Sequence, residues 1–137
     1  MTNKHKAKGD RAELEIAKRL TDILGIPIRR KLGAGRHDDT GDLDGLFNWT
    51  LQVKNRKDIA RTIREGLPQL ETQRTNARTT HAAMLCRMQG GTWIVVLSLD
   101  QWTNMLKHSN HHQTQQQIAP LAMPTQHHPP LDQPPTP

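Results

Sequence analysis

The chain has 137 residues and a mass of 15.6 kDa, so we expect one small domain and no second one. Hydrophobic residues make up 34% and the mean hydropathy is −0.77, so we expect a compact core to which part of the chain does not contribute. All 19 Lys and Arg residues and 12 of the 13 Asp and Glu residues lie in residues 1–107, so this part of the chain has a net charge of +7. Such a charge favours a nucleic-acid partner; the alternative is a charged surface that only keeps the protein soluble.

The first predicted helix covers residues 7–24 and ends at Gly25. Its apolar residues recur at helical spacing: Ile16, Ala17, Leu20, Ile23 and Leu24. Three short strands are expected next, at residues 26–32, 41–46 and 49–55. The last two would form a hairpin around Phe47 and Asn48.

A second helical segment covers residues 58–79 and carries Ile59, Ile63, Leu67 and Leu70 on one side. Pro68 must kink this segment or start another helix. Apolar strands follow at residues 82–88 and 92–98, joined by a glycine-containing turn, and Ser98 is placed to cap a last helix that ends near Lys107. The predicted order is therefore helix, three strands, helix, two strands, helix.

Residues 108–137 are predicted to be a disordered tail behind the domain at residues 1–107. They are rich in Gln, His, Pro and Thr, a composition that buries too little apolar surface to offset the entropy lost on ordering. Five of the 8 histidines lie here, but they have no fixed spacing, so we prefer polar low complexity to a metal-binding tail.

Neither a secreted nor a membrane protein is expected. Cys86 has no partner for a disulfide, and it lies in an apolar run where it is not expected to act as a nucleophile. No apolar signal core follows the basic N-terminus, and no stretch approaches the roughly 18 apolar residues of a membrane span. We therefore predict a cytoplasmic protein without an organic cofactor.

The positions of a few polar residues indicate a site. One lies on the apolar side of a predicted helix, and two pairs lie on the same face of a predicted strand. In the first helix, Glu13 falls on the apolar stripe, where a carboxylate is costly unless it is paired or binds a cation. Residues 49–54 alternate strictly, so Gln52 and Lys54 lie side by side on one face. On the preceding strand, Asp42 and Asp44 are spaced to face the same way.

Together these residues suit the hydrolysis of a phosphodiester. That reaction uses a hard cation to polarise the phosphoryl oxygen and activate water, and Mg²⁺ prefers oxygen ligands. Asp42 would be the central ligand, assisted by the amide oxygen of Gln52 and the backbone carbonyl of Val53. Lys54 would orient the water or stabilise the charge that develops on the phosphate.

The sequence resembles the Holliday junction resolvases of archaea and some phages, which belong to the PD-(D/E)XK nucleases. The resemblance spans roughly residues 7–107 and rests on short motifs in the same order: Lys8-Gly9-Asp10-Arg11-Ala12-Glu13, Arg29-Arg30-Lys31 before Gly33-Ala34-Gly35, Gly41-Asp42-Leu43, Gln52-Val53-Lys54, and the strand Trp93–Leu97. It implies an α/β fold with a restriction-endonuclease-like core and a mixed sheet. It also implies a homodimer, because two symmetric nicks need two active sites. A phage-encoded protein would act in the host cytoplasm.

The resemblance implies a catalytic set of Glu13, Asp42, Gln52 and Lys54. Glu13, Asp42, Gln52 and Val53 would bind Mg²⁺, or Mn²⁺ in its place. The departure from the family is Gln52, where the family has Glu or Asp. A neutral amide should weaken cation affinity unless Asp44 compensates.

Basic residues on both sides of this set are the expected phosphate contacts. They are Arg29, Arg30, Lys31, Arg36, Arg56, Lys57, Arg61 and Arg64, with His37 beside them. With no Tyr and one Phe, a base-stacking platform for single strands is poorly supported, and readout of the backbone and shape of branched DNA fits better.

Four hypotheses follow. The first is a Mg²⁺-dependent, structure-selective endonuclease that nicks branched DNA. The second is a replication or repair nuclease of the same fold that acts on ends or flaps. The third is a DNA-binding accessory protein in which Gln52 has weakened catalysis, and the fourth is a basic domain with an unrelated role.

Overall fold

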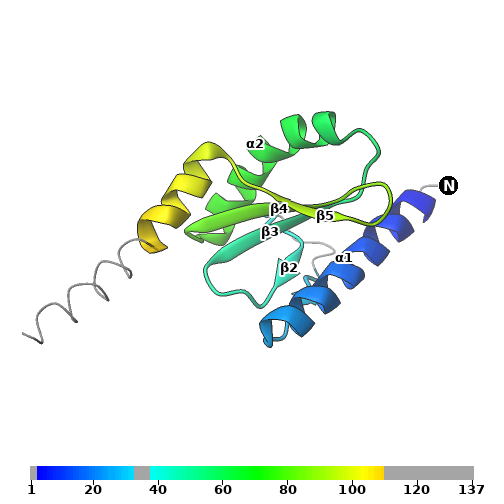
Figure 1. Ribbon diagram of the computed structural model, residues 1–137, viewed down its shortest axis with the longest axis horizontal. Coiled ribbons are helices and arrows are strands. Elements are labelled where there is room, and N and C mark those ends of the chain that lie inside the picture. The colour runs from blue at the N-terminus through cyan, green and yellow to red at the C-terminus, as the bar shows by residue number, and fades with distance from the viewer. Residues whose placement is uncertain (1–2, 33–37, 110–137) are drawn as a thin grey trace, which may run out of the picture. The chain divides into compact units, whose positions relative to one another are not determined.

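The computed structural model describes residues 3–32 and 38–109, and it is an α/β fold (Figure 1). Its elements are α1 (Asn3–Leu24), β1 (Arg29–Arg30), β2 (Leu43–Asp44), β3 (Trp49–Lys54), α2 (Ile59–Ala77), β4 (His81–Arg87) and β5 (Trp93–Val96). A further helix covers residues 99–109, so the described part of the chain has the predicted order of elements. The chain divides into two units, Met1–Trp102 and Thr103–Pro137, and the sheet belongs to the first. Most of the predicted tail, residues 110–137, lies outside the described residues.

The five strands form one mixed sheet in the order β1-β2-β3-β4-β5. Neighbouring strands are antiparallel except for β3 and β4, which are parallel and are connected through α2. In the centre of the sheet, Leu51 is aligned with Leu43 on one side and with Ala83 on the other. Because β3 and β4 are parallel, their last residues, Lys54 and Arg87, lie at the same edge of the sheet.

Alternation along the strands gives the sheet two different buried faces. On one face, Leu43, Leu51, Val53, Ala83 and Leu85 pack with residues of α1. On the other, Ala82, Met84 and Cys86 pack with Leu70 of α2. The two helices thus cover opposite faces of the sheet (Figure 1). Thr50 and Gln52 are the buried polar residues of β3.

Helix α1 is longer than predicted and buries less of its C-terminal turn. It begins at Asn3 instead of residue 7, and its exposed first turn has no apolar pattern that predicts it. Ala12, Ile16 and Ala17 are buried as expected, and Leu20 packs beside them. Ile23 and Leu24 are exposed by 70% and 47%, so the inward placement expected for them is wrong. They lie past Leu20, the last α1 residue that packs on the core.

Helix α2 runs without a break through Pro68, so a second helix starting there is excluded. Pro68 is exposed, and water can satisfy the carbonyl that loses its helical partner at this position. The helix begins with a hydrogen bond from the Arg61 amide to the Asp58 side chain, 3.0 Å long. It ends at Arg78, which has φ 58° and closes the last turn.

The turns position the strands as the sequence predicts. Asn48, with φ 65°, forms the β2–β3 turn, and Gly90 and Gly91 form the β4–β5 turn with φ of 92° and 91°. The Gln101 amide donates to the Ser98 hydroxyl at 3.1 Å, which confirms Ser98 as the cap of the last helix. No helix in the part of the chain that the structure describes is long and apolar enough to cross a membrane.

Candidate active site

Asp42 lies just before β2 and is fixed by three hydrogen bonds. Its amide donates to the Leu51 carbonyl at 2.8 Å, and its carbonyl accepts from the Lys31 amide at 2.9 Å. Its carboxylate accepts from the Val53 amide at 2.8 Å. Asp42 therefore continues the β2–β3 pairing beyond the first residue of β2, and its side chain lies beside the end of β3.

The Asp42 carboxylate lies in an environment that disfavours its charge. Burial raises the pKa of Asp42, and the negative charges of Glu13 and Asp39 raise it further. The hydrogen bond from Val53 and the positive charge of Lys54 act in the opposite direction. Three carboxylates and one lysine thus act on one another here, and a bound cation would relieve the repulsion among the carboxylates.

Gln52 and Lys54 meet at one residue of α2, as expected for neighbours on the same strand face. The Gln52 amide nitrogen donates to Gln69 Oε1 at 3.1 Å, and Lys54 Nζ donates to the same oxygen at 3.4 Å. The Gln52 side chain is only 1% exposed, and its Oε1 has no hydrogen-bond partner among the described residues. A Cβ at Gly66 would lie 2.4 Å from the Met84 methyl carbon and 3.3 Å from this oxygen, so glycine at this position lets α2 pack closely against both side chains.

Glu13 lies within electrostatic reach of Asp42, but it is paired with a cation. Its Oε2 accepts from Arg30 Nε at 2.9 Å, and the same guanidinium contacts Asp10 at 2.8 Å. The hydrogen bond with Glu13 is the main cause of a raised pKa at Arg30. The structure therefore gives Glu13 the paired environment that a carboxylate on an apolar stripe requires, and it engages Arg30, one of the predicted DNA contacts.

Three polar residues of the site were missed by the sequence analysis. Asp39 Oδ2 accepts from Gln73 Nε2 at 2.7 Å, and Asp39 Oδ1 accepts from the Gly41 amide at 3.1 Å. Gln69 lies one turn before Gln73 and contacts Gln52 and Lys54. The one signal for Gln73 is its position three residues after the buried Leu70, on the face of α2 that packs on the sheet.

Asp44, considered above as a replacement for the negative charge that Gln52 lacks, has a different environment. It is exposed and its Cα is paired with that of Arg29 at the edge of the sheet. The carboxylates that act on Asp42 are those of Glu13 and Asp39. Asp39 is therefore the second carboxylate on this side of the sheet, and it precedes Asp42 in the chain.

The predicted phosphate contacts have varied surroundings. Arg29, Arg56, Lys57 and Arg64 are exposed. Arg61 is exposed and paired with Glu65 at 2.9 Å, and the Lys31 ammonium donates to the Thr40 carbonyl at 2.7 Å. Arg36, together with His37 and the predicted glycine loop at residues 33–35, lies outside the described residues.

The oxygen atoms available at the site suit a hard cation better than a soft one. Within residues 3–32 and 38–109, no group of three Asp, Glu, His or Cys side chains is close enough to hold a metal ion. A cation bound at Asp42 would therefore need amide or backbone oxygens as well. Gln52 Oε1 supplies an acceptor without a partner. The Val53 carbonyl points to the same strand edge as the Val53 amide that contacts Asp42.

No protein-family model matches this sequence, and comparisons with the curated proteins and with solved structures find no match either.

Proposed function

We propose that this protein is a Mg²⁺-dependent, structure-selective endonuclease of the PD-(D/E)XK type that nicks four-way junctions or other branched DNA. The observation that carries the proposal is the convergence of Asp42, Gln52 and Lys54 at the end of β3, on a domain with a strongly basic composition. A carboxylate, a free amide oxygen and an ammonium group suit the binding of a cation, a phosphate and a water molecule.

The topology supports the finer assignment of a restriction-endonuclease-like core. An antiparallel β1-β2-β3 meander is followed by a crossover through α2 to the parallel strand β4. This arrangement brings a residue that precedes β2 and two residues near the end of β3 to one edge of the sheet. Gly41-Asp42-Leu43 and Gln52-Val53-Lys54, which resemble the Asp and E-x-K motifs of the resolvases, lie at these two places.

Each residue has a defined role in the proposed reaction. Asp42, the Gln52 amide oxygen and the Val53 carbonyl would hold Mg²⁺, or Mn²⁺ in its place, and the ion would polarise the phosphoryl oxygen and lower the pKa of the attacking water. Lys54 would hold that water or neutralise the charge that grows on the phosphate. Gln69 would fix the orientation of both Gln52 and Lys54 through its shared oxygen.

Glu13 would join this set only after its contact with Arg30 is loosened. Arg30 contacts both Glu13 and Asp10 and balances the negative charge next to Asp42. A DNA phosphate that draws the guanidinium of Arg30 toward itself would release the Glu13 carboxylate toward the cation. Under this proposal, substrate binding and completion of the metal site are coupled.

A homodimer is the proposed active form, because resolving a junction requires two nicks and each chain has one set of these residues. The exposed cations beside the site would contact phosphates on both sides of the cut strand. The second candidate function is a DNA-binding accessory protein. It is favoured by the neutral Gln52 and by the engagement of Glu13 with Arg30, both of which lower the negative charge available to a cation.

The test is incubation of the purified protein with a labelled four-way junction, a flap, a free-ended duplex and a matched linear duplex. Each substrate is combined with Mg²⁺, Mn²⁺ or EDTA, and Asp42→Asn is compared with the matched variant Asp44→Asn, two residues further along the chain. Paired nicks confined to the junction, dependent on metal and lost only in Asp42→Asn, are expected. Cleavage of flaps or ends would instead assign a repair nuclease. Tight junction binding without cleavage under any condition would favour the accessory protein.

A further inference from the structure

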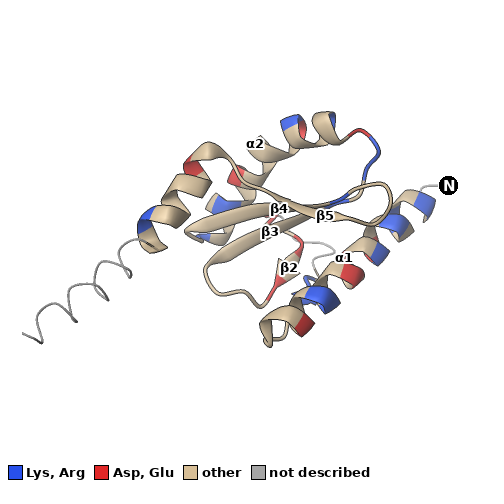
Figure 2. Cartoon of the chain, in the orientation of Figure 1, with Lys and Arg blue, Asp and Glu red and all other residues tan. Residues whose placement is uncertain are grey.

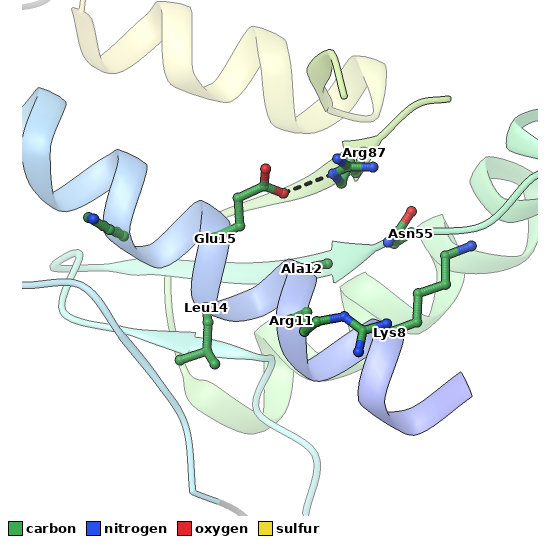
Figure 3. Close-up of a pocket in the computed structure, with 8 residues that line it drawn as sticks. Lys8, Arg11, Ala12, Leu14, Glu15, Asn55 and Arg87 are labelled. Atoms are coloured by element: carbon green, nitrogen blue, oxygen red, sulfur yellow. Dashed lines mark hydrogen bonds and ion pairs between the residues drawn. The ribbon is translucent and has the colours of Figure 1, made fainter. Parts of the chain in front are cut away.

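A groove of about 720 Å³ lies beside α1, at the edge of the sheet where β3 and β4 end (Figure 3). We call it the α1 groove. It is lined by Lys8, Arg11, Ala12, Leu14, Glu15, Lys18, Asn55 and Arg87. None of its four cationic residues is among the DNA contacts that the sequence predicts.

The α1 groove is strongly basic. Its single acidic residue, Glu15, is paired with Arg87 at 2.8 Å, and this contact joins α1 to the end of β4. Among the residues that the structure describes, Lys8, Arg11 and Lys18 form no ion pair. Three positive charges along one helix are thus left for an external anion.

The positive charges are arranged along a line. Lys8, Arg11 and Lys18 recur at helical spacing on one side of α1, and Figure 2 shows the concentration of Lys and Arg on this helix. A second, smaller hollow shares Lys8 and Arg11 and adds Lys4 and His5 from the first turn. At about 1.5 Å per residue, Lys8 and Lys18 are about 15 Å apart, which matches about four nucleotides of one duplex strand.

The α1 groove and the proposed active site lie at the same edge of the sheet. Asn55, which lines the groove, directly follows Lys54 of the site. Arg87 is the last residue of β4, which ends beside β3. The groove borders α1 and Lys54 contacts α2, so the two lie on opposite faces of the sheet at the same strand ends, and a DNA molecule that wraps around these strand ends contacts both.

We propose that the α1 groove binds the sugar-phosphate backbone of the DNA substrate next to the cleaved phosphate. This inference rests on the proposed function for its substrate but not on cleavage itself. The chemistry is that of a regularly repeating polyanion: Lys8, Arg11 and Lys18 contact phosphates along one strand, and Arg87 adds a fourth positive charge that Glu15 partly neutralises.

The experiment measures binding of the full chain to a labelled four-way junction in EDTA over a range of salt concentrations. The triple variant Lys8→Gln, Arg11→Gln, Lys18→Gln is compared with wild type and with Arg78→Gln, a single-charge control at the far end of α2 that is exposed and lies outside the groove. Circular dichroism and thermal melting confirm that each variant folds. Glu15→Gln is the variant of opposite sign, since it frees Arg87.

Each lost phosphate contact lowers the slope of log K against log salt by about 0.9, so the triple variant should lose about 2.7 from its slope. Raising the salt concentration fourfold should then weaken wild-type binding about 40-fold more than it weakens binding by the triple variant. Arg78→Gln should keep the wild-type slope, and Glu15→Gln should bind more tightly than wild type.

A triple variant with the affinity and slope of wild type would overturn the proposal. It would also be overturned if Arg78→Gln lost as much slope for its one charge, about 0.9, as the triple variant loses for each of its three. Binding of polyglutamate by wild type, with DNA binding intact in the triple variant, would assign the groove to an acidic protein instead and also overturn it. If wild type fails to cut any substrate while the triple variant loses DNA binding, the groove proposal stands and the nuclease proposal fails.

Discussion

Replacing Asp42 by Asn should make the protein more stable at neutral pH while abolishing any cleavage. Burial is the main cause of the raised pKa of Asp42, so the ionised carboxylate opposes folding. Asn has nearly the same shape, and its side-chain oxygen can still accept the hydrogen bond from the Val53 amide. The expected gain is about 0.5 to 2 kcal/mol at pH 7, which is typical of a single stabilising substitution.

The gain should depend on pH in one direction. Because the pKa of Asp42 is higher in the folded state than in the unfolded state, the carboxyl group stabilises the fold only while it is protonated. That stability is present below the unfolded pKa, about 3.9, and is lost as the pH rises through the folded pKa. Asn does not titrate, so the advantage of the variant should be smallest at low pH and should grow until Asp42 is fully ionised.

The assay is urea unfolding followed by circular dichroism from pH 3 to pH 8, in EDTA so that no cation neutralises Asp42. Asp44→Asn is the matched control, since Asp44 is an exposed aspartate two residues further along the chain and its replacement should change stability by less than about 0.5 kcal/mol. If Asp42→Asn is less stable than wild type at pH 7, or if the difference does not grow with pH, the carboxylate stabilises the fold and our reasoning fails. Adding Mg²⁺ should raise the Tm of wild type and of Asp44→Asn but not that of Asp42→Asn.

Three further predictions concern the neighbourhood of the site. Gly45→Ala should lower stability by more than about 3 kcal/mol, because φ is +116° and the new Cβ would lie 2.2 Å from the Pro27 carbonyl oxygen. Gly90→Ala, with φ +92° and open space around it, should lose only about 1 to 2 kcal/mol, and equal losses in urea unfolding would contradict this contrast. Gln52→Glu should destabilise the metal-free protein and tighten Mg²⁺ binding about tenfold in calorimetry; unchanged affinity would remove Gln52 from the ligand set. Leu51→Ala, at the buried centre of the sheet, should cost about 2 to 5 kcal/mol, and a loss below about 1 kcal/mol would show that the sheet is packed differently.

The sequence predicts the order of the elements because each one has a strong local pattern. Alternation from Trp49 to Lys54 is enough to place Gln52 and Lys54 together, and the structure gives both the same partner on α2. Local sequence patterns predict the bounds and burial of an element incorrectly where the element extends beyond the hydrophobic core. The first turn of α1 is fully exposed, and Ile23 continues an apolar stripe that no longer faces the sheet.

The pairing of charges could not be predicted in this way. Arg30 and Glu13 come from different elements, and only the packing of α1 beside β1 brings the guanidinium to the carboxylate. Asp39 lies in a segment without periodicity, and its partner Gln73 is 34 residues away. Such contacts depend on the three-dimensional arrangement of elements, which residue spacing does not report.

Because α2 connects β3 to β4, some contacts of the site can form before α2 packs on the sheet and others only afterwards. The contact between Asp42 and Val53 spans 11 residues within the β2–β3 hairpin, so it can form as soon as that hairpin closes. The contact between Asp39 and Gln73 spans 34 residues, and it requires α2 to fold back on the sheet. Transient detachment of α2 would therefore expose Gln52 and release Asp39 while leaving Asp42 in place. Amide hydrogen exchange at Val53 should accordingly be slower than at the residues of α2 that cover the site.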